Sequence, residues 1–108
     1  MSRPADDGEF NAQILACIDR SLIFLGRDVK DSLYFQIQKR CDLEASQIAS
    51  KPKLFVDCLA NTLGASATAI VERLMVAEIR SFFGIPPSTG EKGLPEVIEE
   101  AKRKFLTC

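Results

Sequence analysis

The four cysteines of this sequence are its residues best suited to chemistry, and they lie far apart, at Cys17, Cys41, Cys58 and Cys108. Structural zinc sites use closely spaced cysteine pairs, often completed by histidine. The chain has no C-x-x-C pair and no histidine, so a metal site would need four scattered thiolates. We therefore expect no metal site and no other cofactor.

The spacing of the cysteines instead favours a packing role. Cys17, Cys41 and Cys58 fall on the apolar faces of predicted helices, where a thiol packs as a small hydrophobic group. An intramolecular disulfide is expected only if the source is a hyperthermophile, because most cytoplasmic proteins keep their thiols reduced. Cys41 is the best candidate nucleophile because Lys39 and Arg40 precede it, but the nearby helix C-terminus disfavours a thiolate.

The remaining polar residues offer little for catalysis. The absence of histidine removes the commonest general base. Glu72 and Glu78 are six residues apart on a predicted helix, so they point in different directions, and we expect both to face solvent. The sequence contains no glycine-rich phosphate-binding loop and no nucleophile-elbow motif. We therefore predict a protein without catalytic residues.

The elements that would position these residues belong to one ordinary globular domain. The chain has 108 residues, 46% of them hydrophobic and 27% charged, which is enough for a single packed core. Its formal net charge is −1, so no overall positive field would attract nucleic acid or a membrane surface. No apolar run approaches the roughly 18 residues that span a bilayer. We expect a cytoplasmic protein.

Apolar residues recur at helical spacing in the first half of the chain. The first stripe consists of Phe10, Ile14, Ile18, Leu22 and Leu25, and the second of Val29, Leu33, Ile37 and Cys41. Gly26 is placed to end the first helix, and Tyr34 is expected to be half-buried beside the second stripe. Between 42 and 50 the periodicity lapses, so Leu43 and Ile48 should anchor a packed loop or a short helical turn.

Two further helices are predicted at 52–63 and 65–83. Ser50 is a candidate cap and Pro52 suits the first turn of the third helix, while Gly64 separates the two helices. The fourth helix is apolar on nearly all sides, so we expect it to be the most buried element. Either the other helices wrap around it or a second copy of the chain covers it; the pattern favours neither.

A last amphipathic helix follows the Pro- and Gly-rich connection 86–93. Its stripe consists of Leu94, Ile98, Ala101 and Phe105. The sequence therefore predicts an all-α bundle: a core of four helices with a polar arm in 1–85, a linker in 86–93 and a C-terminal helix in 94–108. This helix docks either permanently on its own chain or, as a separable arm, on a partner.

Several segments resemble a small, uncharacterised archaeal family of all-helical proteins. The resemblance covers about Leu22 to Ile85 and depends on the segments at 25–30, 33–35, 48–55 and 82–85, together with Leu63-Gly64. Members are stand-alone proteins or output domains attached to signalling modules. The resemblance implies an archaeal origin and a regulatory or interaction role, and it supplies no catalytic residues.

Protein interaction is the function that the sequence favours. Exposed or half-covered apolar residues on the fourth and last helices would supply a homodimer interface or a surface for another protein. The candidate interaction residues are Leu74, Arg73, Arg80, Ile98 and Phe105. The alternative is a weak DNA-binding regulator, in which basic residues between Arg27 and Lys53 would have to converge. The helix after Gly26 opens with mixed charges and the helix after Gly64 opens with alanines, and both patterns argue against that alternative.

Overall fold

The computed structural model describes residues 7–86 and 93–107. Within these ranges the chain forms five α-helices, one 3-10 turn and no strand, which confirms the predicted all-α fold. The elements are α1 (Asp7–Ile23), α2 (Arg27–Cys41), η1 (Ala45–Gln47), α3 (Pro52–Leu63), α4 (Ala65–Phe83) and α5 (Leu94–Thr107). The short turn η1 lies between Leu43 and Ile48, whose side chains are both buried as expected.

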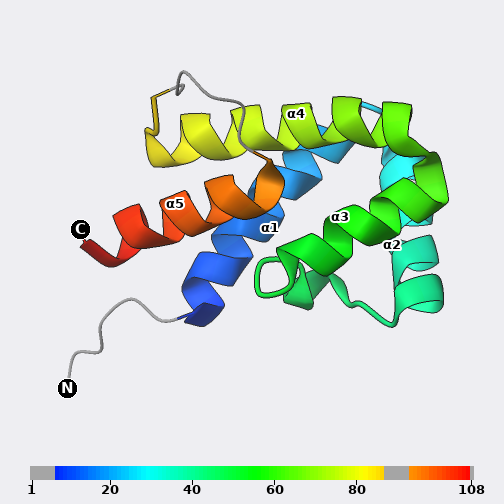
Figure 1. Ribbon diagram of the computed structural model, residues 1–108, viewed down its shortest axis with the longest axis horizontal. Coiled ribbons are helices and arrows are strands. Elements are labelled where there is room, and N and C mark those ends of the chain that lie inside the picture. The colour runs from blue at the N-terminus through cyan, green and yellow to red at the C-terminus, as the bar shows by residue number, and fades with distance from the viewer. Residues whose placement is uncertain (1–6, 87–92, 108) are drawn as a thin grey trace.

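Helix α4 packs against α1, α3 and α5, and these helices enclose the core (Figure 1). Val71, Met75 and Ile79 are buried there, but Leu74 is only half-buried and Ile70 is 63% exposed. The prediction that α4 is the most buried element is wrong, because more residues are fully buried on α1 than on α4. The neighbouring helices thus cover most of α4 and leave one face open.

Backbone geometry explains where α4 ends. Gly84 adopts the left-handed conformation, with φ 68° and ψ 34°, which glycine enters without steric cost. The amide of Ile85 then donates to the carbonyl of Arg80 at 2.8 Å, and the Ile85 side chain folds back into the core. This is the helix stop that the sequence predicts.

The start of α3 differs in part from expectation. Pro52 occupies the first turn as predicted, and Lys51 is the N-cap without a side-chain hydrogen bond. The predicted cap, Ser50, instead donates from its hydroxyl to the carbonyl of Gln47 at 3.0 Å. Ser50 therefore closes the turn that precedes α3 rather than capping the helix.

A disulfide joins α2 to α3. Cys41 and Cys58 are bonded, with their Cα atoms 6.4 Å apart. Cys58 and the unbonded Cys17 are buried as predicted, whereas Cys41 is half-buried. The prediction that Cys41 and Cys58 pack as thiols is therefore wrong, because their two stripes place them on the facing sides of neighbouring helices, close enough to bond.

Helices α4 and α5 run parallel and cap one another. A carboxylate oxygen of Glu72 accepts a hydrogen bond from the amide of Leu94 at 2.7 Å, at the start of α5. The ammonium of Lys104 donates to the carbonyl of Gly84 at 2.8 Å, at the end of α4. Each charge lies at the helix end whose dipole it complements, which stabilises this parallel arrangement.

The carboxylates of α4 are therefore not the solvent-facing groups that the sequence predicts. Glu72 caps α5, and Glu78 lies 3.6 Å from the guanidinium of Arg20 on α1. Both partners come from helices distant in sequence, so the spacing along α4 gives no sign of them. Tertiary packing turns both residues into connections between helices.

Candidate functional site

The turn between α1 and α2 carries the most exposed cluster of large apolar residues. We call it the apolar ridge and define it as Ile23, Phe24, Leu25 and Val29. Their exposed fractions are 47%, 80%, 41% and 43%. Large apolar side chains gathered in this way on a small domain commonly mark an interaction site.

The backbone of the turn brings the ridge residues together. Helix α1 ends at Ile23, and the amide of Gly26 donates to the Ile23 carbonyl at 2.9 Å. Gly26 has φ 117°, and a methyl group placed on it would lie 3.8 Å from the Val29 side chain. Val29 therefore lies against the same turn that displays Phe24 and Leu25.

This arrangement corrects two sequence predictions. The stripes included Leu25 and Val29 as buried residues, but Leu25 lies beyond the end of α1 and Val29 is in the first turn of α2. The apolar side chains of a helix become exposed where that helix extends beyond the end of the helix packed against it. The side chains at the two ends of the predicted stripes consequently form an exposed surface.

Arg20 connects α1 to the C-terminal part of α4. Its guanidinium lies 5.4 Å from the centre of the Phe82 ring and pairs with Glu78. Phe82 is 48% exposed and packs edge-on against Phe83, with ring centres 5.0 Å apart. Since Phe83 in turn packs against Phe10, with ring centres 5.7 Å apart, this cluster lies toward the N-terminal half of α1 and is separate from the apolar ridge.

The predicted interaction residues are not brought together. Arg73 is exposed, while Leu74 and Arg80 are half-buried on α4. Ile98 is only 3% exposed and lies in the core, and the Phe105 ring packs 5.4 Å from that of Phe10 on α1. Helix α5 is docked on its own chain, which was one of the two arrangements that the sequence allowed.

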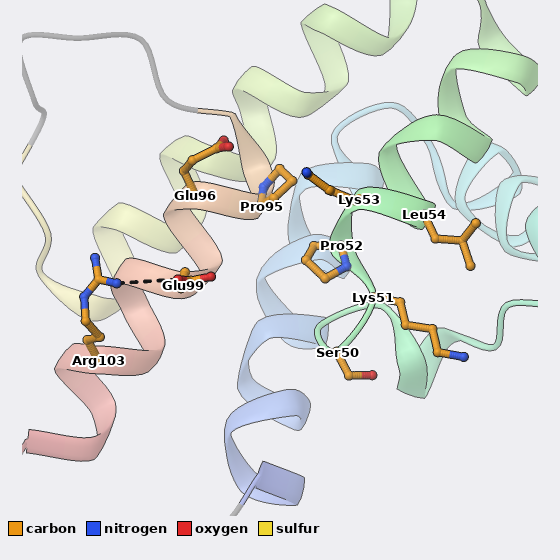
Figure 2. A pocket seen from close by; sticks show the side chains of 9 residues that line it. All are labelled: Ser50, Lys51, Pro52, Lys53, Leu54, Pro95, Glu96, Glu99 and Arg103. Carbon is orange, nitrogen blue, oxygen red and sulfur yellow. Dashed lines mark ion pairs between the residues drawn. The ribbon is translucent and has the colours of Figure 1, made fainter.

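A groove of about 840 Å³ separates the start of α3 from α5 (Figure 2). Its α3 wall comprises residues 50–54, and its α5 wall comprises Pro95, Glu96, Glu99 and Arg103. Arg103 pairs with Glu99 at 3.7 Å. The α3 wall carries two lysines and the α5 wall two carboxylates, so the opposing charges largely balance. Sequence patterns carry no signal for this groove, because its two walls are far apart in the chain.

The basic residues considered for DNA binding are distributed over several surfaces. Arg27 and Lys39 lie near opposite ends of α2, about 18 Å apart at the helical rise. Lys51 and Lys53 line the groove opposite two carboxylates. These positions do not build the single positive patch that nucleic-acid binding requires.

Two titratable groups, the buried Cys17 and the half-buried Tyr34, lie within the packing of the first helices. Burial raises the pKa of the Cys17 thiol above its ordinary value, so the thiol stays protonated. The hydroxyl of Tyr34 donates to the carboxylate of Asp19 on α1. Burial first, and then this hydrogen bond and the Asp19 charge, raise the pKa of Tyr34. Both side chains serve packing in this arrangement.

Within residues 7–86 and 93–107, no group of three or more cysteines, aspartates or glutamates lies close enough to hold a metal ion. None of the described helices is both long and apolar enough to cross a membrane. Comparisons with family models, with curated proteins and with solved structures find no match to this chain. The resemblance to the archaeal family therefore stays a prediction.

Proposed function

We propose that this protein is a non-catalytic interaction module of the cytoplasm that self-associates as a homodimer and regulates a protein partner. The apolar ridge carries this proposal. The four residues of the ridge fall within seven positions of the chain, and each is between 41% and 80% exposed. Burial of such side chains away from water is the main favourable contribution to protein association.

The size of the ridge suits a symmetric interface. From their exposed fractions, the four residues present roughly 400 Å² of mainly apolar surface. A standard interface buries about 800 Å² per partner, a little over half of it apolar. Two ridges facing one another would thus supply most of the apolar centre of a homodimer.

The charges beside the ridge also favour pairing with a second copy. Arg27 and Lys30 alternate with Asp28 and Asp31 along the first turns of α2. In a two-fold symmetric dimer the same surface of both subunits meets. A basic residue of one subunit can then lie opposite an acidic residue of the other when the two charges alternate along that surface. Opposite charges placed at the rim would set the register of the dimer.

Analytical ultracentrifugation over a range of concentrations tests this proposal. We expect the wild-type protein to be in monomer–dimer equilibrium and Phe24→Ser to weaken dimerisation by about tenfold or more. The matched control is Phe35→Ser, because Phe35 is 60% exposed on α2 outside the ridge. A wild-type chain that stays monomeric at high concentration would disprove self-association, and equal effects of both variants would disprove the ridge as the interface.

A further inference from the structure

The Cys41–Cys58 disulfide encloses one wall of the α3–α5 groove. Cys41 is the last residue of α2, and Cys58 lies within α3, 17 positions later. All the groove residues of the α3 wall, 50–54, fall inside the loop that this bond closes. The opposite wall belongs to α5, outside the loop. The bond therefore ties one wall, and not the other, to the end of α2.

We propose that the Cys41–Cys58 disulfide is a thiol-responsive latch, whose reduction frees the α3 wall of the groove while the helical core stays folded. This latch is independent of the proposed self-association, because the groove is formed by α3 and α5 and not by the ridge residues.

The two bonded cysteines differ in exposure. Cys58 is 1% exposed, whereas Cys41 is half-buried at the end of its helix. An external thiol can therefore reach Cys41 and not Cys58. Lys39 and Arg40 are exposed in the same last turn of α2, and the exposed carboxylates of Asp42 and Glu44 follow directly, so the charges around Cys41 balance and do not repel a small thiol such as glutathione.

Reduction follows ordinary thiol–disulfide exchange. The thiolate of one external thiol attacks Sγ of Cys41, the S–S bond breaks, and Cys58 leaves as a thiolate that takes up a proton. A second external thiolate attacks the external sulfur of the mixed disulfide and releases Cys41. Two thiols are oxidised to one external disulfide, and their two electrons reduce the protein bond.

The packing around the loop explains why the core survives reduction. Leu43, Ile48 and Phe55 are buried inside the closed loop and keep it anchored without the bond. The polar residues of the α3 wall, Lys51 and Lys53, are exposed and lack comparable anchoring. Cys17 is fully buried on α1, so it does not exchange with the freed thiols.

Hydrogen exchange read by mass spectrometry tests the latch on the full chain, with the oxidised protein compared with protein reduced by millimolar glutathione without denaturant. We expect the disulfide to be reduced under these conditions and exchange in 50–54 to accelerate by about tenfold or more at Ser50 and Lys51, whose amides donate to the carbonyl of Gln47, with much smaller changes in α1 and α4. The Cys41→Ser/Cys58→Ser double variant should reproduce the reduced pattern in the absence of any thiol.

Cys17→Ala is the matched control, since it removes a cysteine and leaves the latch in place. It should respond to glutathione as the wild type does. The latch is disproved if glutathione reduces the bond only in denaturant, or if exchange stays unchanged across 50–54. It is also disproved if exchange rises equally in every helix, or if the double variant is unfolded by circular dichroism.

Discussion

Tyr34 connects the first two helices through a single hydrogen bond to Asp19, and its ionisation is set by that position. Burial is the largest cause that raises its pKa, followed by the hydrogen bond and the charge of Asp19. The folded protein thus holds the phenolic proton more tightly than the unfolded chain does. The contribution of Tyr34 to the free energy of unfolding is therefore fully present below the pKa of the unfolded chain, about 10. This contribution declines as the pH rises above that value.

Alkaline titration should therefore unfold the protein or leave Tyr34 protonated. Since Tyr34 is the only tyrosine and the chain has no tryptophan, phenolate absorbance reports this residue alone. We expect the phenolate to appear only together with loss of helical circular dichroism. In Tyr34→Phe the free energy of unfolding should decrease less steeply above about pH 10 than in the wild type. A phenolate that forms near pH 10 in the folded protein would contradict the prediction.

Glu72 is the other residue whose role depends on a distant partner. Its carboxylate accepts the Leu94 amide, and Gly93 leaves room for it, because a methyl group there would come within 3.0 Å of a Glu72 oxygen. We expect Glu72→Ala to lower the free energy of unfolding by about 1–3 kcal/mol, because an amide in the first turn of α5 loses its charged partner.

Urea denaturation measures this effect. Glu99→Ala is the control, since the Glu99 side chain is 75% exposed and its pair with Arg103 lies on the surface of α5. That variant should change stability by no more than about 0.5 kcal/mol. Equal losses in the two variants would show that Glu72 acts only as a surface charge.

At the scale of elements, hydrophobic periodicity and glycine positions predicted nearly all of the fold. The expected limits of the fourth helix, 65–83, are those of α4. The periodicity could not show where other helices stop covering a stripe, so Leu25 and Val29 were expected to be buried and are exposed. It also could not reveal the ridge or the groove, because both depend on how the helices lie against one another.

Helix α5 is a part of the core, and its removal should show this. Leu94, Val97, Ile98 and Ala101 are each no more than 3% exposed. Loss of these contacts removes about 5–10 kcal/mol of hydrophobic stabilisation, comparable with the whole stability of a small domain. A chain ending at Ile85 should therefore lose its cooperative thermal transition, measured by circular dichroism. A truncated chain that stays folded with altered self-association would instead establish α5 as a separable arm.

For the whole molecule, the disulfide is the covalent bond that joins α2 to α3, two helices that lie together at one end of the fold (Figure 1). The bond closes a loop with a sequence separation of 17 residues. A loop of this size restricts the unfolded chain enough to contribute about 3 kcal/mol to stability. The buried core on α1, α4 and α5 does not depend on the bond, so reduction should weaken the fold without abolishing it.

We expect the reduced wild-type protein to unfold cooperatively with a Tm about 10–20 °C below that of the oxidised protein. The measurement is a pair of thermal melts followed by circular dichroism, with and without a thiol reductant. In Cys41→Ser the two melts should coincide at the lower Tm, since no bond remains to be reduced. In Cys17→Ala the difference should persist, because this buried thiol is outside the bond. Wild-type melts that coincide with and without reductant would show that the bond leaves the unfolded chain unrestricted, and the fold would then depend on packing alone.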